Sequence, residues 1–568
     1  MLNGSAQNQS IMSHNFGRIS PPRIQRSTFK MPFGHKWCMD AGTLYPWFLQ
    51  EILPGDTMNT RASFVARLAT LINPIMDNIF IDTFWFYVPN RLIWDNWERF
   101  QGYRPTPSST VDFELPSMRH SSGTPEADLN FSEGSIYDAF GLPINIGIKY
   151  QDAPISLPMR AYYLIWNQWF RNPDVQDELI LLTGDGPDYI ADFALQSRNK
   201  RHDYFASCLA APQKGDAVLI PIGDSAPVVG GVAGSGIALG LRSRDLTNSS
   251  WVEKGAQTEG SGTYLQWSAG ALGDALGVVQ GSAETFRQSS SMGVSLDPDL
   301  SGLQLVDAVA DLSAANGINL NQFRELIVLQ QILELDSRGG TRYSEALKVR
   351  WGIDAEDYRL QRPEYLGGSS ERVNISAVPQ TSGSGTSAQG NLAAFGIATA
   401  QSKFFKTFKE HGFVIGIANI RADQTYQEGM RKLWSRRTRA DLYEPLAANL
   451  GEQAVLKKEL VVSGVTATDN AVFGYQERWA EYRYMPSILS GAMRSNSAVP
   501  LDSWHLAIDF NNTCPTLEDF MTDDPPVDRV IATSEASNFV KQFNIDAYAE
   551  TLHARPMPVY SVPGLDRF

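Results

Sequence analysis

The chain has 568 residues, of which 43% are hydrophobic, 11% aromatic and 19% charged. This composition is typical of a folded protein and excludes a disordered one. The formal net charge of −14 excludes a surface that coats DNA throughout, because such a surface would be basic. The three cysteines, Cys38, Cys208 and Cys514, are far apart and odd in number, which predicts buried, reduced thiols.

Residues 1–45 are predicted to form a basic, extended N-terminal arm. Residues 1–39 contain no aspartate or glutamate, and prolines stand at positions 21, 22 and 32. Positive charge without nearby acids predicts phosphate contacts that do not depend on nucleotide sequence. The alternative is that these cations pair with acidic groups of neighbouring chains. The candidate phosphate-contacting residues are Arg18, Arg23, Arg26, Lys30 and Lys36.

Strand patterns gather at the two ends of the remaining chain, in 46–100 and 400–568. Arg61–Leu68 alternates apolar and polar residues, which predicts a half-buried strand. Ile79–Val88 and Phe413–Ile420 are nearly continuous apolar runs, which predict strands buried on both faces. Trp504–Phe510 alternates again. We therefore predict one mainly β domain over 46–568, a β-barrel with long loop and helix-containing insertions in 101–400.

Two helices are predicted inside these insertions. Ser156–Phe170 reads as a helix that is apolar on most sides. Asn319 is a possible cap for a second helix, whose apolar stripe is predicted to pack on the barrel. The stripe consists of Leu320, Phe323, Ile327 and Leu333.

Residues 224–306 differ in composition from both flanks. They contain 14 glycines, eight acidic residues and four basic residues. Glycine at this density disfavours a packed helix, so we predict a variable surface insertion. Its most apolar part, Ser225–Leu241, is short and broken by glycines, which argues against a membrane span. Met1–Ser10 is polar and lacks the apolar core of a signal peptide.

The sequence carries no local signature of catalysis, cofactor binding or metal binding. It contains no phosphate-binding G-x-x-x-x-G-K-[ST], no G-x-S-x-G and no C-x-x-C. His202-Asp203 could form part of a triad, but a surface pair is favoured. A carbohydrate-binding or hydrolytic β-barrel enzyme and a spike or adhesin subunit remain the alternatives to a shell protein. The enzyme would need converging carboxylates in a cleft.

A series of ordered motifs resembles the major capsid proteins of gokushoviruses, small single-stranded DNA phages of the Microviridae. The motifs run in family order over 13–220 and 310–568. Residues 224–306 match no part of the pattern. The motifs include Leu53–Thr57, Val88–Trp97, Leu157–Tyr162, Trp166–Arg171, Lys200–Phe205, Arg338–Tyr343, Gln361–Gly368, Phe473–Trp479 and Arg555–Tyr560.

The resemblance implies a viral jelly roll and a T=1 icosahedral shell of sixty copies around a circular single-stranded DNA genome. It also implies a host-facing protrusion at the threefold axes, formed by 224–306. The implied location is the virion, assembled in the host bacterial cytoplasm without membrane insertion. The implied partners are a small basic DNA-binding packaging protein, an internal scaffolding protein, a pilot protein and a host surface receptor.

Candidate contacts between subunits come from aromatic and arginine residues, which dominate interface energies. The candidates are Trp94, Trp97, Arg555, Pro556 and Tyr560. For each tryptophan, burial in the core is an equal alternative. The proline-rich tail Ala554–Pro563 disfavours a central strand, so we expect it to cross a subunit boundary.

Overall fold

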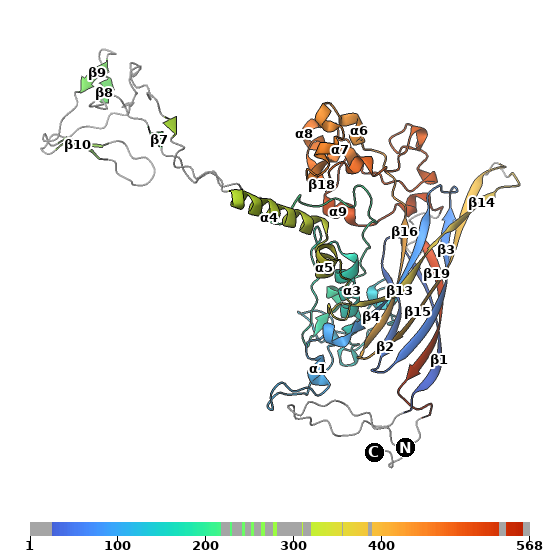
Figure 1. Ribbon diagram of the computed structural model, residues 1–568. Coiled ribbons are helices and arrows are strands. Elements are labelled where there is room, and N and C mark those ends of the chain that lie inside the picture. Colours follow the sequence, from blue (N-terminus) through green and yellow to red (C-terminus); the bar gives the residue numbers. More distant parts are fainter. Residues whose placement is uncertain are drawn as a thin grey trace. The chain divides into compact units, whose positions relative to one another are not determined.

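A computed structural model describes residues 25–216, 218, 320–354, 356–383, 389–532 and 541–560, with the backbone of six short strands between 228 and 310. The chain divides into two compact units. One comprises Met1–Asp216 and Gln330–Phe568, and the other Ala217–Leu329. Figure 1 shows the elements of both.

The larger unit is built on two antiparallel sheets. The five-stranded sheet has the order β1 (Ser27–Met39), β19 (Phe543–Arg555), β3 (Thr57–Leu71), β15 (Leu392–Thr407) and β14 (Asn374–Pro379). The four-stranded sheet has the order β13 (Glu364–Arg372), β4 (Ile79–Pro89), β16 (Gly412–Ala422) and β2 (Tyr45–Ile52). Successive long strands mostly alternate between the sheets, which is the strand order of a jelly roll. Among the described strands, no ladder joins the two sheets.

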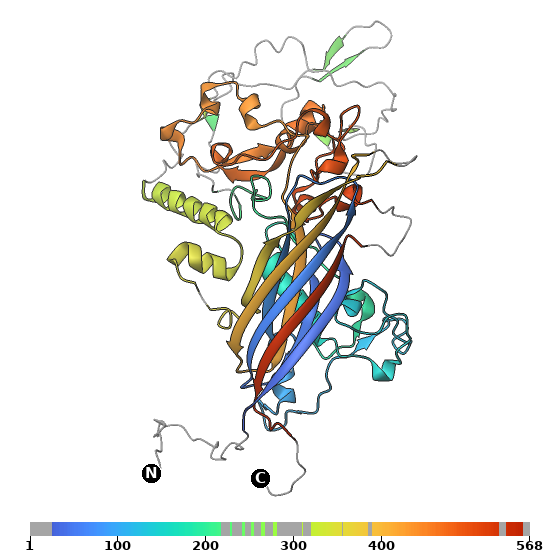
Figure 2. The same ribbon diagram turned by 90° about the vertical axis from the view of Figure 1, so that its right-hand side faces the viewer.

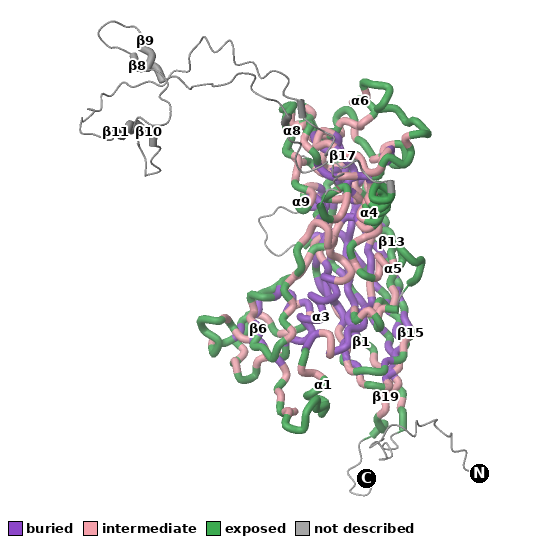
Figure 3. Tube along the Cα trace, turned by 60° about the vertical axis from the view of Figure 1, so that its left-hand side comes forward, coloured by how far each residue is buried: buried purple, intermediate pink, exposed green. Residues whose placement is uncertain are grey.

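The core between the sheets follows the side-chain period of two. In β3, Ala62, Phe64, Ala66 and Leu68 are buried, and the residues between them are exposed, as predicted. Trp47 lies at the centre of the core, with its ring 4.8 Å from that of Phe64 and 5.1 Å from that of Trp85. The Trp85 indole also donates a hydrogen bond of 3.0 Å to Ser402, so its polar atom is satisfied. Figure 3 shows this buried layer in purple.

The outer face of the four-stranded sheet is covered by the first insertion. Helix α3 (Leu157–Ile165) and the π-helical turn Trp166–Phe170 confirm the predicted helix, and α3 packs over β4 and β16. The two apolar strand predictions are therefore confirmed and explained, because β4 and β16 have the core on one face and α3 on the other. Figure 1 shows this second layer beside β4 and β13.

A buried ion pair fixes α3 in place. The guanidinium of Arg160 meets the carboxylate of Asp188 in a bidentate pair at 2.7 and 2.8 Å, and both side chains are fully buried. The Nη1 atom of Arg160 donates to the carbonyls of Ile93 and Gly184 at 3.1 and 2.9 Å. Such a pair is tolerated in a core because each of the three guanidinium nitrogens donates at least one hydrogen bond.

The other described α-helices and strands of the larger unit are short. They are α1 (Trp97–Phe100), β5 (Met118–Arg119), α2 (Ile136–Ala139), β6 (Asp188–Tyr189), α5 (Tyr343–Trp351), α6 (Lys432–Ser435), β17 (Glu452–Leu456), α7 (Lys457–Leu460), α8 (Thr466–Asp469), β18 (Val472–Glu477) and α9 (Leu517–Met521).

The smaller unit contains three antiparallel strand pairs among its described residues. They are β7 (Val228–Val229) with β12 (Val309–Ala310), β8 (Leu241–Arg244) with β9 (Trp251–Lys254), and β10 (Thr263–Gln266) with β11 (Gly277–Gln280). Helix α4 (Leu320–Arg338) begins in this unit and continues into the larger one. The predicted insertion 224–306 lies within its bounds.

Three sequence predictions need correction. The second half of the predicted arm is not an extended arm, because β1 pairs along its length with β19 and buries Trp37 and Met39. The α4 stripe is only partly buried among its described residues: Phe323 and Ile327 are 39% and 42% exposed, whereas Leu333 is half-buried, and α3 already covers the four-stranded sheet. Cys38 is exposed, whereas Cys208 is buried and Cys514 half-buried; all three are free.

The predicted strand Trp504–Phe510 is also wrong. A 3₁₀ turn occupies Asp502–Trp504, and His505, Leu506 and Ala507 are all buried, so burial does not alternate. The backbone N–H of Leu506 donates to the Asp77 carboxylate, and that of Phe510 to Glu428 at 2.8 Å. Side-chain acceptors therefore replace the ladder that a strand would need.

Adjacent residues of β3 test this architecture. Phe64 is 1% exposed and Val65 is 49% exposed. We predict that Phe64→Ala lowers the free energy of unfolding by about 3–5 kcal/mol, while Val65→Ala changes it by less than about 0.5 kcal/mol. Urea titration of unassembled subunits measures both. Equal costs for the two substitutions would contradict the assigned faces.

Candidate assembly surfaces and the cleft

Large apolar side chains are exposed throughout the segment between β16 and β19. We call residues 433–501 the apolar segment. Leu446 is 95% exposed, Met485 82% and Trp434 69%. The other large apolar residues exposed there are Leu433, Leu442, Tyr443, Leu450, Val462, Val465, Val472, Tyr482, Tyr484, Ile488, Val499 and Leu501. Figure 2 shows most of this segment in orange, above the sheets.

The backbone of the apolar segment is held in place even though these side chains point outward. The Trp479 indole donates to the carbonyl of Ala447 at 3.2 Å. Arg436 pairs with Glu481 at 3.1 Å and lies over the Tyr482 ring at 4.3 Å. An ordered surface with this much apolar area is typical of a protein interface. Sequence analysis missed it, because irregular segments show no periodic pattern; the capsid-like motifs Phe473–Trp479 and Glu481–Arg483 were the signals there.

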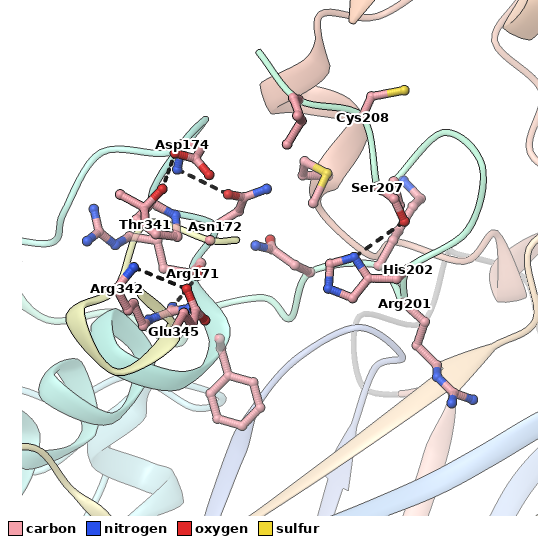
Figure 4. A pocket seen from close by; sticks show the side chains of 18 of the residues that line it. Arg171, Asn172, Asp174, Arg201, His202, Ser207, Cys208, Thr341, Arg342 and Glu345 are labelled. Carbon is pink, nitrogen blue, oxygen red and sulfur yellow. Dashed lines mark hydrogen bonds and ion pairs between the residues drawn. The ribbon is translucent and has the colours of Figure 1, made fainter. Parts of the chain in front are cut away.

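A cleft of about 910 Å³ opens beside the covered sheet. It is lined by the end of the α3 layer, by residues 198–209 and by the α4–α5 connection, and Figure 4 shows part of its wall. Its four carboxylates all meet basic side chains. Asp174 lies 3.5 Å from Lys214, Glu345 lies 3.2 Å from Arg342, and Glu452 and Glu477 pair with Arg338 and Arg483. This cleft therefore offers no converging pair of free carboxylates of the kind that glycoside hydrolysis needs.

His202 and Asp203 do not form part of a triad in this cleft. The Asp203 carboxylate accepts the backbone N–H groups of Phe205 and Ala206 at 2.9 and 2.7 Å, and also the Tyr426 hydroxyl. The His202 ring lies 3.5 Å from the Ser207 hydroxyl (Figure 4). Asp203 caps a turn, so its role here is structural.

The predicted phosphate-contacting residues are only partly described. Arg18 and Arg23 lie outside the described residues. Arg26 donates to the Thr57 hydroxyl at 2.7 Å, while Lys30 and Lys36 are exposed on β1. Lys36 pairs with Asp546 of its own chain at 3.3 Å, and both side chains stay more than half exposed. Such an exposed pair contributes little stability and leaves the lysine accessible.

The candidate subunit contacts divide into buried and exposed residues. Trp94 is fully buried and donates to Asp185 at 2.8 Å, which favours the alternative that it belongs to the core over a contact with another subunit. Trp97 is half-buried, with its ring 5.4 Å from that of His411. Tyr560 is 81% exposed.

The start of the C-terminal tail is anchored within its own chain. Arg555 lies 3.1 Å from the buried carboxylate of Asp56, which also accepts a hydrogen bond of 2.9 Å from His553. Pro556 lies beside Gly55. Arg555 and Pro556 therefore close the end of the sandwich between the β2–β3 turn and β19, and the exposed tail begins after them.

Comparison with known families decides the identity. The family described as "Capsid protein (F protein)" matches residues 18–565. The chain belongs to this capsid protein family. It is 40% identical over 567 residues to capsid protein VP1 of Bdellovibrio phage phiMH2K, covering 99% of this chain and 98% of that protein. It is 38% and 32% identical to capsid protein VP1 of Chlamydia phage 1 and of Spiroplasma virus 4, with 98% of both chains covered in each case.

The protein is thus a structural major capsid protein of a gokushovirus-type microvirus, as the motifs indicated. Proteins of this family build a multi-copy shell around the viral genome, which places the chain in the virion. Among the described residues, no helix is long and apolar enough to cross a membrane. No group of three or more metal-binding side chains occurs in that part of the chain either.

In the capsid protein, the charges of Arg198 and Arg421 act on two buried aspartates, and Arg198 also lines the cleft. Asp82 accepts from Arg421 at 2.8 Å and also pairs with Arg198. Burial alone would raise the pKa of Asp82, but the Ser370 hydrogen bond and the Arg198 charge outweigh it and lower that pKa. Burial raises the pKa of Asp523 to about 6, although Lys200 and Arg198 oppose the rise.

These two aspartates should respond oppositely to pH. Asp82→Asn leaves two cations without their anion, so we expect a loss of about 3–5 kcal/mol at pH 7. That loss should shrink as the pH falls below the ordinary aspartate range near 4, because wild-type Asp82 then loses its charge.

Asp523 binds its proton more tightly when folded, so wild type should gain stability as the pH falls from 6 to 4, and Asp523→Asn should lack that gain. Thermal unfolding of unassembled subunits across pH 3–7 measures both; parallel curves would contradict the assignment.

Proposed function

We propose that sixty copies of this chain form a closed T=1 icosahedral shell around a circular single-stranded DNA genome. The observation that supports self-assembly most directly is the apolar segment, whose ordered backbone presents large apolar side chains that the chain itself does not cover. Closed symmetry lets one chain build a container by repeating a few contacts. The chain has no enzymatic role in this proposal, which accords with the structural capsid protein family to which it belongs.

The net charge of −14 implies that other molecules neutralise most of the genome. We propose a small basic packaging protein for this role. An internal scaffolding protein and a pilot protein complete the proposed assembly partners, and assembly takes place in the host bacterial cytoplasm. The basic residues Arg18, Arg23, Arg26, Lys30 and Lys36 face the interior and touch phosphates.

The tail after Pro556 extends the contacts to a neighbouring subunit. Its described part, Met557–Tyr560, is exposed: Met557 is 38%, Val559 59% and Tyr560 81% exposed. Prolines deprive such a segment of backbone donors, which disfavours its addition to a sheet. Exposed apolar side chains on a chain end therefore favour docking on another copy.

Sedimentation of purified wild-type protein tests the shell and separates the alternatives. A closed shell sediments as one large species, a spike or adhesin subunit as small oligomers, and an enzyme of the alternative class as monomers or small oligomers. Electron microscopy of the large species then counts its copies. The absence of large particles under all assembly conditions would overturn the proposal.

Substitutions in the apolar segment should block assembly without unfolding the chain. We predict that Leu446→Asp and Trp434→Asp prevent particle formation, because each places a charge in a desolvated contact. Their unfolding free energies should stay within about 0.5 kcal/mol of wild type, because both side chains are exposed in the single chain. Ile180→Asp is the matched control, since Ile180 is 80% exposed outside this segment and its substitution should leave particles intact. Normal particles from both segment variants would contradict the assignment.

We propose that residues 224–306 form the host-facing protrusion of the shell at its threefold axes. Eight acidic residues outnumber four basic ones there, which suits an outer surface and disfavours contact with DNA. Loop closure depends weakly on length, so a long insertion is tolerated at low cost. A host surface receptor is its proposed partner.

Replacing residues 224–306 with a short Gly-Ser linker tests this role. We predict soluble particles of normal size that no longer attach to host cells, because the sheets and their core lie entirely outside this range. Sedimentation measures assembly, and a cell-binding assay measures attachment. A variant chain that fails to fold would show that the segment belongs to the core instead.

A further inference from the structure

Among the described residues of the larger unit, no helix covers the outer face of the five-stranded sheet. Figure 2 views this face directly, with β1, β19, β3 and β15 side by side and no helix in front of them. Phe405 is 70% exposed and Tyr548 47% exposed on it. In the opposite sheet, β4 and β16 are buried on both faces, so this open face is a specific feature of one side of the sandwich.

The charge of this face differs from that of the whole chain. In an acidic protein, the outward positions of its strands carry five cations and two anions. The cations are Lys30, Lys36, Arg61, Arg67 and Lys403, and the anions are Asp546 and Glu550. Apart from Lys36, whose pair with Asp546 is given above, these cations form no side-chain ion pair or hydrogen bond among the described residues.

Strand register places the aromatic rings around one of these cations. Arg61 lies opposite Glu550 on one side and Lys403 on the other. Along β3, Ser63 follows Arg61 by two residues and lies opposite Tyr548 of β19. Asn59 precedes Arg61 by two residues and lies opposite Phe405 of β15. From the rise along a strand and the spacing between strands, the Cα atoms of Tyr548 and Phe405 are roughly 16 Å apart. Arg61 lies between them both along the strands and across the sheet.

Polar and small neighbours leave the rings accessible. Tyr548 is flanked across the strands by Gly34 and Ser63, and Phe405 by Asn59. Aromatic rings on an open sheet stack with nucleic-acid bases, and adjacent cations hold the phosphates. An interface between protein subunits is depleted of charge at its centre, whereas here Glu550, Arg61 and Lys403 occupy a middle row. Charge and ring placement therefore favour a nucleic-acid strand over a second subunit.

We propose that this face binds single-stranded DNA without sequence specificity, with bases stacked on Tyr548 and Phe405 and phosphates held by Arg61 and Lys403. The proposal rests on the proposed shell function, because the strand in question is the enclosed genome. It adds a base-stacking site to the phosphate contacts expected of the N-terminal arm. It also gives the open sheet an orientation, with its outer face toward the interior of the shell.

Binding of a fluorescent 20-nucleotide oligothymidine to unassembled full-length protein, measured by anisotropy over a salt series, tests the site. Tyr548→Ala and Phe405→Ala should each weaken binding by about fivefold to 100-fold at constant salt. Arg61→Ala should reduce the slope of log affinity against log salt by about 0.7. Glu550→Gln should strengthen binding, because it removes an anion beside Arg61.

Matched controls come from exposed residues away from this face. Tyr343→Ala on α5, where Tyr343 is 70% exposed, and Arg372→Ala on β13 should leave affinity and salt slope unchanged. Wild-type affinity in the Tyr548→Ala/Phe405→Ala double variant would overturn the proposal. So would loss of particle formation in that variant with DNA affinity unchanged, because the face would then be a subunit interface. Sedimentation of the wild-type protein tests shell formation separately. A wild-type protein that forms no large particles would refute the shell, whatever the DNA affinities of the variants are.

Discussion

The structure depends on one constraint: every strand side chain points to one of two faces of its sheet. A face that is apolar must be buried, and a face that is polar can be exposed to water. In β3, buried and exposed residues alternate from Met58 to Leu68, so the five-stranded sheet needs an apolar partner on its inner side alone. In β4 and β16 both faces are apolar, so the four-stranded sheet needs a second cover. The insertion after β4 supplies that cover, and the sandwich becomes asymmetric as a consequence.

This asymmetry connects the fold to the role of a shell protein. The covered side carries α3, the buried Arg160–Asp188 pair and the cleft. The other side presents a solvent-exposed sheet face with basic and aromatic side chains. The segment between β16 and β19 adds an ordered apolar surface. A container subunit needs surfaces toward its neighbours, its contents and the outside, and one chain with uneven layers can provide each of them separately.

Sequence patterns predicted a strand correctly where each of its faces is uniformly buried or uniformly exposed. The alternation in Arg61–Leu68 and the apolar runs of β4 and β16 followed directly from burial on one face or on two. The capsid motifs identified the family and the jelly roll without any structural information. The strand β1 was missed because its burial comes from pairing with β19, more than 500 residues later in the chain, and prolines and cations dominate its local composition.

Other features depended on tertiary contacts that no local pattern reveals. The alternation of Trp504–Phe510 resembled a strand, but Asp77 and Glu428 supply the acceptors that fix that segment. Trp94 and Trp97 belong to one motif, yet the core buries the first completely and the second only in part. The stacking site requires three strands to be in register, and its residues come from positions 61, 403 to 405 and 548. Sequence analysis nominated Lys30 and Lys36 on this face but neither Arg61 nor Lys403, because only the strand register brings these two beside the rings.

The most direct test of this account is a cryo-electron microscopy reconstruction of DNA-filled particles. The account predicts a closed shell in which the five-stranded sheet turns its outer face inward, with density for nucleic acid over Tyr548, Arg61 and Phe405. It also predicts the apolar segment at contacts between subunits. A reconstruction in which that sheet face lies on the outside of the particle, or is covered by another subunit, would contradict it.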